Sequence, residues 1–214
     1  KQFIRNQFNS LLQSQGHKTG IVTVENPANE EDRLAEVKRL GVMDRDLSSE
    51  NRYSAMTQVA SYLTGCAQSA INILGSNVQQ CKVSYGYDMI QSTLMKEIPR
   101  EISVCQFSLA NPGKPLIIEN ILEDERTKNM QKLPAAPNFI FYAGSPLISS
   151  RGYSLGVLCV FDPSTKTLAH QQIEELRLLS DQVVNMLKND AGLSYGEAKN
   201  QDEDAQTGRL EGKY

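Results

Sequence analysis

The chain has 214 residues, a formal net charge of −3, 40% hydrophobic residues and 22% charged residues. One domain of ordinary size with flanking segments fits this length, and the balanced composition argues against a wholly disordered chain. The slight acidity gives no reason to expect a nucleic-acid surface, and no apolar run approaches the roughly 20 residues of a membrane-spanning helix. The chain begins at Lys1 without a signal-peptide pattern, so we expect a cytoplasmic segment of a longer protein.

The cysteines argue against a metal site. With only two histidines in the chain and no Cys-x-x-Cys pair, no zinc-ligand spacing is present. Three of the four cysteines sit inside apolar or strand-like runs, which is typical of buried free thiols in a reducing compartment. The four are Cys66, Cys81, Cys105 and Cys159.

Helical spacing of apolar residues predicts three helices in the first third of the chain, the first of them short and amphipathic over residues 1–15. The second begins after Asn29, where acidic residues in the first turn favour a helix start. The third has Ser48 or Ser49 as its capping candidate and ends at Gly65. The residues predicted for its buried face are Tyr53, Met56, Val59, Ala60 and Leu63.

Strand patterns follow. Residues 66–74 and 78–85 read as two paired strands joined by a Gly-Ser-Asn turn. The pattern then loosens over residues 86–138, where we expect a short helix at 103–110 and a short strand at 116–118. Long, loosely patterned segments over a regular sheet are where binding sites tend to lie.

The most regular pattern lies between residues 138 and 162, where two long apolar strands flank a turn at 149–152. A hairpin of this length predicts the central ribbon of a larger sheet, because an isolated pair of strands is barely stable in water. A helix with a wide apolar stripe is predicted over 168–189. The polar, Gly-containing remainder, 191–214, reads as a linker.

Four strings carry a resemblance to a known family, and they lie at residues 29–42, 99–105, 141–147 and 153–160. Together with the order of the elements, they resemble the GAF domain, a small-molecule sensor module. The resemblance implies an α+β fold with a six-stranded antiparallel sheet. The first, second and last helices of the domain would cover one face, and residues 86–138 would form a roof of loops and short helices over a ligand pocket on the other.

The resemblance also implies a division of the chain. Residues 1–28 would be an N-terminal helix and connector, residues 29–190 the GAF sensor domain, and residues 191–214 a linker toward an absent output domain. The last eight residues, 207–214, resemble the entry into the catalytic domain of class III adenylate or guanylate cyclases.

The function implied is that of a non-catalytic, ligand-sensing regulatory domain controlling a downstream signalling output, namely a nucleotide cyclase. The expected partners are a small-molecule ligand and a second copy of the chain, because GAF domains often dimerise through their terminal helices. Neither nucleic acid nor a membrane segment is expected. The resemblance does not identify the ligand or any cofactor.

A cyclic nucleotide (cAMP or cGMP) is one alternative ligand. Cyclic-nucleotide-binding GAF domains carry an Asn-Lys pair after the last strand, followed by Phe and then Asp-Glu in the final helix. This chain has Phe161-Asp162, Leu168 and Gln172-Ile173 at those places. The absence of the motif weakens the case for a cyclic nucleotide. It does not exclude one, since those residues support the pocket more than they touch the ligand.

Two different functions also remain open. One is that of a purely structural dimerisation module with a filled pocket. The second is that of a thiol-based redox sensor, or an enzyme similar to methionine sulfoxide reductases, acting at Cys105. The resolving cysteine of such an enzyme would be expected near Asn129, where this chain has no cysteine. Covalent bilin attachment needs a cysteine directly before a histidine, and His17 and His170 lack one.

The candidate ligand-binding residues lie at predicted strand ends and in the roof, where aromatic rings and a few polar groups would suit a small planar ligand. For Phe107 and Tyr142, plain core packing is an equal alternative to ligand binding. The candidates are Tyr85, Cys105, Phe107, Asn120, Asp124, Asn129, Tyr142 and Ser145.

Overall fold

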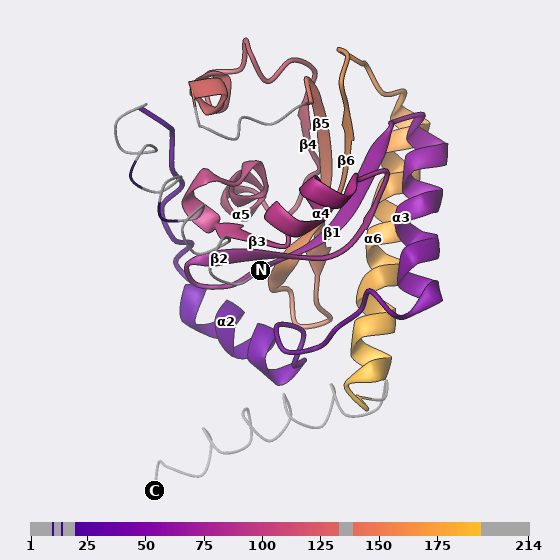
Figure 1. Ribbon diagram of the computed structural model, residues 1–214. Helices are drawn as coiled ribbons and strands as arrows, with labels where there is room; N and C mark the ends of the chain where they lie inside the picture. Colours follow the sequence, from indigo (N-terminus) through magenta and orange to yellow (C-terminus); the bar gives the residue numbers. More distant parts are fainter. Residues whose placement is uncertain (1–9, 11–13, 15–19, 133–138, 194–214) are drawn as a thin grey trace, which may run out of the picture.

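Figure 1 shows the computed structural model of the protein. The residues that it describes are Ser10, Ser14, 20–132 and 139–193. The helix predicted over residues 1–15 and nearly all of the linker predicted over residues 191–214 therefore lie outside the described residues. No helix in the described part of the chain is long and apolar enough to cross a membrane.

A six-stranded antiparallel sheet forms the centre of the fold, with the strand order β3-β2-β1-β6-β5-β4. The expected α+β architecture is therefore confirmed. The long strands lie in the middle, and strands of three residues form both edges. The strands are β1 (Gln68–Leu74), β2 (Val78–Tyr85), β3 (Glu97–Pro99), β4 (Leu116–Ile118), β5 (Phe141–Ile148) and β6 (Ser154–Asp162).

The predicted hairpin is confirmed as β5 and β6, which pair from Phe141 opposite Asp162 to Ile148 opposite Ser154. Gly156 shows why the second strand can sit so tightly beside β1. A Cβ atom at this position would lie 2.0 Å from the carbonyl oxygen of Asn72, which is backbone and cannot move aside. Only glycine allows this close approach of two strands.

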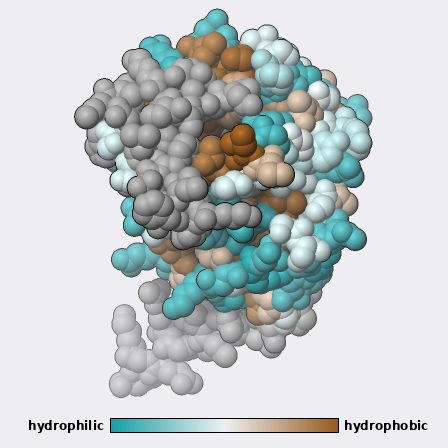
Figure 2. All heavy atoms as spheres, in the orientation of Figure 1, coloured by the Kyte–Doolittle hydropathy of each residue, from teal (hydrophilic) through white to brown (hydrophobic). Residues whose placement is uncertain are grey.

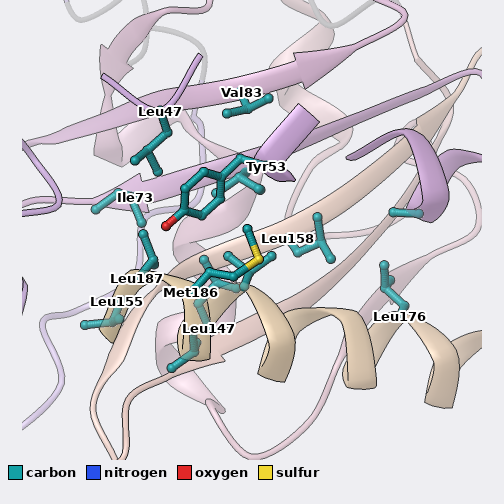
Figure 3. Packing of buried hydrophobic residues seen from close by; sticks show 14 of the residues in the cluster. Leu47, Tyr53, Ile73, Val83, Leu147, Leu155, Leu158, Leu176, Met186 and Leu187 are labelled. Carbon is teal, nitrogen blue, oxygen red and sulfur yellow. The ribbon is translucent and has the colours of Figure 1, made fainter. Parts of the chain in front are cut away.

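Three helices cover one face of the sheet, which we call the helix face: α2 (Glu30–Arg39), α3 (Asn51–Thr64) and α6 (His170–Asp190). In Figure 1, α3 and α6 run side by side along the sheet, and α2 lies across its lower end. Figure 3 shows Leu158, Met186 and Leu187 converging between α6 and the sheet. The predicted placement of the helices on one face is confirmed.

The buried face of α3 differs from the one predicted. Val59 and Leu63, which the periodicity assigned to the core, are 37% and 38% exposed. The helix begins after Glu50, not after Ser48 or Ser49. The buried hydroxyl residues of α3 each donate a hydrogen bond to a backbone carbonyl, so these small side chains pack inward without an unpaired hydrogen. They are Thr57, Ser61 and Thr64.

The opposite face, which we call the roof face, is covered by the described part of the roof segment. This segment contains more regular structure than predicted, because α4 (Met89–Leu94) and β3 precede the expected short helical region. Asp88 and Gln91 form a reciprocal capping box that starts α4, a spacing already visible in the sequence. The remaining helical pieces are η1 (Arg100–Ile102), η2 (Val104–Gln106), α5 (Phe107–Ala110) and η3 (Lys128–Lys132).

Candidate ligand site beneath the roof

The roof face of the sheet carries a buried cluster that combines aromatic rings, sulfur atoms and aliphatic side chains. The rings of Tyr142 and Phe161 meet edge to face at 5.5 Å between centroids, and Phe139 lies 4.7 Å from Phe161. Tyr87, from the start of the roof, closes on Phe161 at 6.3 Å. Aromatic rings at these separations are in direct contact with one another and form a packed cluster.

Four polar side chains meet at the centre of this cluster. The side-chain nitrogen of Asn72 on β1 lies 3.2 Å from the sulfur of Cys159 on β6 and 3.5 Å from the sulfur of Cys105 in η2. The hydroxyl of Tyr142 on β5 donates to the Cys105 sulfur at 3.3 Å. The three central strands and the roof thus each contribute one group to a single point. We call Asn72, Cys105, Tyr142 and Cys159 the thiol–amide site.

One atom of this site is unsatisfied. The side-chain oxygen of Asn72 is buried and has no hydrogen-bond partner within the described part of the chain, and the residue is 2% exposed. An unpaired buried acceptor costs about 1–3 kcal/mol, so a donor from elsewhere would be favourable here. The site is therefore suited to a ligand that offers an N–H or O–H group.

The thiol of Cys105 is electrostatically distinct from its neighbours. Hydrogen bonding from Cys159, supported by Tyr142, Asn72 and Ser103, outweighs burial and lowers the pKa of Cys105 to about 7. Burial raises the pKa of Cys159 well above its ordinary value, and its hydrogen bond to Cys105 adds to that shift. Cys105 therefore loses its proton before Cys159 does, because the hydrogen-bond donors point at the Cys105 sulfur.

Neighbouring groups fix Cys105 in the roof. The backbone nitrogen of Cys105 donates to the hydroxyl oxygen of Ser103 at 3.0 Å, and that hydroxyl donates to Gln79 on β2. Gln106 is also held at both ends of its amide, by the backbone nitrogen of Val24 at 3.0 Å and by the carbonyl of Glu101 at 2.7 Å. The start of η2 is thereby anchored to the sheet, and its end to the segment before α2.

The structure brings together three of the predicted ligand-binding residues, namely Cys105, Phe107 and Tyr142, in the roof-face cluster. Phe107 is 7% exposed, and the guanidinium of Arg126 lies 5.9 Å from the centre of its ring. A cation over an aromatic face at this distance closes the cluster on the side of residues 119–132, which follow β4 and which we call the roof loop.

Three further candidates, Asn120, Asp124 and Asn129, lie in the roof loop and make local contacts there. The side-chain oxygen of Asn120 accepts from the backbone of Leu122 at 3.0 Å, which shapes the turn. Asp124 forms an ion pair with Arg126, whose Nε lies 2.8 Å from the carboxylate, and these contacts outweigh burial and lower its pKa. Asn129 donates to the carbonyl of Gly20 at 2.8 Å.

Two predicted placements are wrong, because Tyr85 and Ser145 lie on the helix face. The ring of Tyr85 packs 6.1 Å from that of Tyr62 on α3. Ser145 lies two residues from Ala143 and two residues from Leu147, and both of these point into the helix-face core. Because residues two apart in a strand share a face, the side chain of Ser145 also points to the helix face. Neither residue reaches the thiol–amide site.

Asn72 and Cys159 were missed as site residues. Asn72 is a polar residue inside the apolar run Ala70–Leu74, and such an interruption of a buried strand is the signal that could have identified it. Cys159 carried no signal of its own, since an apolar strand readily contains a buried thiol. The described residues contain no group of three or more His, Cys, Asp or Glu side chains placed to hold a metal ion.

The chain is similar to known proteins in sequence as well as in fold. A family model described as "GAF domain" matches residues 49–187, more than half of the chain. A cyclic di-GMP phosphodiesterase of Pseudomonas aeruginosa is 28% identical over 136 residues, which are 64% of this chain and 22% of that protein. The chain thus spans about a fifth of the length of this curated relative.

Solved structures share the fold at low identity. The GAF domain of an Acinetobacter phosphoenolpyruvate-protein phosphotransferase superposes with a TM-score of 0.55 at 14% identity, covering 80% of this chain and 99% of that one. A type II free methionine-R-sulfoxide reductase from Thermoplasma acidophilum gives a TM-score of 0.51 at 12% identity, covering 65% of this chain and 94% of that one. At these identities the likeness concerns the fold alone. With the matched family model, the sheet order and the roofed face, the chain belongs to the GAF domain family of sensory domains.

Proposed function

We propose that this chain is the non-catalytic, ligand-sensing domain of a longer signalling protein and that its ligand binds at the thiol–amide site. The unpaired, buried oxygen of Asn72 carries this proposal, because it is an acceptor that the described residues leave unsatisfied. The favoured ligand is a small, planar molecule with a hydrogen-bond donor for that oxygen. The rings of Tyr142, Phe161 and Phe139 contact one another, so they would have to part to admit its body.

Binding would reach the output through β5. Tyr142 points into the ligand site, whereas the opposite face of the same strand packs against α6. The Ser180 hydroxyl on α6 lies 3.4 Å from the carbonyl oxygen of Ser145 on β5. A ligand that moves Tyr142 and orders the roof would therefore shift α6, and residues 191–214 would transmit the shift to the output domain.

The output domain is proposed to be a nucleotide cyclase, on the resemblance of residues 207–214 to a cyclase entry segment. The alternative is a cyclic di-GMP phosphodiesterase domain, which the Pseudomonas aeruginosa relative favours by its name. In either case the protein would act in the cytoplasm, with a connector at residues 1–28, the sensor at 29–190 and a linker after it.

A homodimer through the terminal helices is part of the same proposal. Apolar side chains that the sheet does not cover project from α3 and α6, and they are large enough to be costly in water. Tyr62 is 70% exposed and Leu178 is 57% exposed, and Val59 and Leu63 extend the same surface of α3. Pairing of two α3–α6 faces would bury these residues and place the two output domains side by side.

The test uses the full-length protein and its Asn72→Leu variant, with Ser145→Ala as the control on the opposite face of the sheet. Native mass spectrometry of protein purified from cells should find a retained small molecule with the wild type and with Ser145→Ala, and none with Asn72→Leu. Output activity should then respond to the extracted ligand in the first two proteins only. An output that is unchanged when residues 29–190 are deleted would refute the proposal.

A second candidate function, thiol-based sensing, is favoured by the lowered pKa of Cys105 beside Cys159. The Cys105 thiolate would attack a hydroperoxide, breaking its O–O bond, releasing an alcohol and leaving a sulfenic acid. The Cys159 thiol would then displace water to form a disulfide. Peroxide treatment followed by mass spectrometry distinguishes the two functions. Ligand sensing predicts that the cysteines stay reduced and that the output is unchanged. Thiol sensing predicts a Cys105–Cys159 disulfide that alters the output.

A further inference from the structure

A groove of about 500 Å³ lies beside the part of β2 that extends beyond its pairing with β3. Its walls come from the loop between α2 and α3, from residues 80–84 of β2 and from the segment that joins α4 to β3. It adjoins the roof-face cluster at Cys81 and Tyr87, but none of the four thiol–amide residues lines it. A groove of this size accommodates a small molecule.

A β-bulge shapes this groove. Asn72 on β1 pairs with Cys81, and Ile71 pairs with Val83, so Lys82 is an extra residue in β2 without a partner on β1. The ammonium group of Lys82 donates to the carbonyl oxygens of Met43 at 2.6 Å and Arg45 at 3.0 Å. Two of its three hydrogens are thus used, and the third is available to the groove. Bulges of this kind re-aim a side chain at an edge.

The groove offers unused donors, and it also carries the negatively charged carboxylates of Asp44, Asp46 and Glu97. Nη1 of Arg45 is buried and has no hydrogen-bond partner among the described residues. Asp46 accepts from the backbone and the hydroxyl of Ser48 at 3.0 and 2.6 Å. Glu97 accepts from the side chain of Gln80 at 3.2 Å. The remaining acid, Asp44, is exposed at the rim.

We propose that this groove is a second ligand site, which binds a small organic anion through a carboxylate or phosphate group held by Arg45 and Lys82. The exposed Lys96 adds a third positive charge at the mouth, so that the three cations of the groove balance its three carboxylates. The apolar body of the ligand lies against Met95 and Tyr87. This site is separate from the thiol–amide site, and the proposal does not depend on the function proposed above.

The same arginine connects the groove to the end of α6. Nη2 of Arg45 pairs with the carboxylate of Asp190, the last residue of α6, which also accepts from the hydroxyl of Tyr53 at 2.6 Å and from Arg52 at 2.5 Å. An anion on Nη1 fixes the guanidinium while Nη2 stays on Asp190. Ligand binding in the groove therefore stabilises the last turn of α6.

The test titrates the 214-residue protein with benzoate and with phenyl phosphate, and uses uncharged benzamide as the matched control. At least one anion should bind about tenfold or more tightly than benzamide, since a charge-assisted hydrogen bond contributes about that factor. Tighter binding of benzoate assigns a carboxylate ligand, and tighter binding of phenyl phosphate assigns a phosphate ester. Amide hydrogen exchange should slow in residues 43–48 and 186–193 on binding.

Variants separate binding from folding. Lys96→Gln changes an exposed side chain and should weaken the anion about tenfold, and Lys82→Gln should do the same if its thermal unfolding matches the wild type. Lys114→Gln, an exposed lysine outside the groove, should bind as the wild type does. The proposal is overturned if benzamide binds as tightly as both anions, or if Lys96→Gln and Lys82→Gln both leave the affinity unchanged.

Discussion

The two faces of the sheet differ in what they bury. The helix face encloses hydrocarbon, with Leu158, Val183 and Leu187 at 0% exposure between the sheet and α6 (Figure 3). The roof face encloses the thiol–amide site among its aromatic rings, and it leaves the oxygen of Asn72 unpaired. The helix face also buries polar groups, since the hydroxyl of Ser145 lies there without a partner among the described residues, but the roof face gathers an amide, a phenol and two thiols at one point.

The outer surfaces of both sides expose large apolar side chains. On the roof side, α4 buries none of its residues, and Met89 and Ile90 are 85% and 70% exposed. Figure 2 shows brown, apolar atoms near the middle of the visible face, where Figure 1 places α4. A short helix held by a capping box rather than by packing opens at low free-energy cost. We therefore expect α4 to open more easily than the helices that pack on the sheet.

The largest effect is expected from the helix-face core. Leu187→Ala should lower the free energy of unfolding by about 3 kcal/mol, because it leaves a cavity where no solvent reaches. Leu178→Ala, on the same helix but 57% exposed, should change it by less than about 0.5 kcal/mol. Urea denaturation of both variants measures the contrast. Equal losses would show that the helix face does not dominate stability.

The end of α6 should show a smaller, pH-dependent effect. Burial raises the pKa of Asp190, but hydrogen bonds from Tyr53, Arg45 and Arg52 outweigh it and lower the pKa below its ordinary value. Asp190→Asn should therefore cost about 1 kcal/mol at pH 7, a value reduced by the partial exposure of its arginine partners.

The sign of the pH dependence follows from the lowered pKa. The stabilisation by Asp190 is complete above the unfolded pKa, about 3.9, and is lost as the pH falls through the folded pKa. Thermal unfolding of the two proteins should therefore differ most above about pH 4 and converge only as the pH falls through the folded pKa of Asp190. Asp181→Asn, in an exposed pair with Arg177, should differ little from the wild type at any pH, and a matching loss there would contradict a special role for Asp190.

On the roof face, Tyr142→Phe should alter chemistry more than stability. Loss of the hydroxyl that donates to Cys105 at 3.3 Å removes one of the contacts that lower its pKa to about 7. The pKa should rise toward the ordinary cysteine value of about 8.5. Thiolate absorbance, corrected with a Cys105→Ser variant, measures it. Tyr153→Phe, at the hairpin turn, is the control, and an unchanged pKa in Tyr142→Phe would refute the hydrogen bond.

The smallest effect is expected at Ser145, whose buried hydroxyl has no partner in the described part of the chain. Ser145→Ala should change the free energy of unfolding by less than about 1 kcal/mol and should leave ligand binding intact. Ser180→Ala, which loses a hydrogen bond to Leu176 at 3.0 Å, should be the more destabilising of the two. Loss of ligand in Ser145→Ala would place this residue on the binding side after all.

Much of the fold was predictable from local sequence. The hairpin of β5 and β6, the strands β1 and β2, and the ends of α2 and α3 at Gly41 and Gly65 follow from alternation, turn residues and positive φ at glycine. The face of Ser145 was also predictable. It lies three residues from Tyr142, and an odd spacing in a regular strand places two side chains on opposite faces.

The tertiary structure decided the rest. Tyr85 is four residues from Cys81, a spacing that should place both on one face, but the bulge at Lys82 reverses the alternation and turns Tyr85 toward α3. The bulge arises from pairing with β1, which the local pattern of β2 does not contain. Likewise Asn72 and Cys105 meet only because separate strands and the roof converge. Sequence alone determined the elements and their order, and long-range pairing determined which side chains share a site.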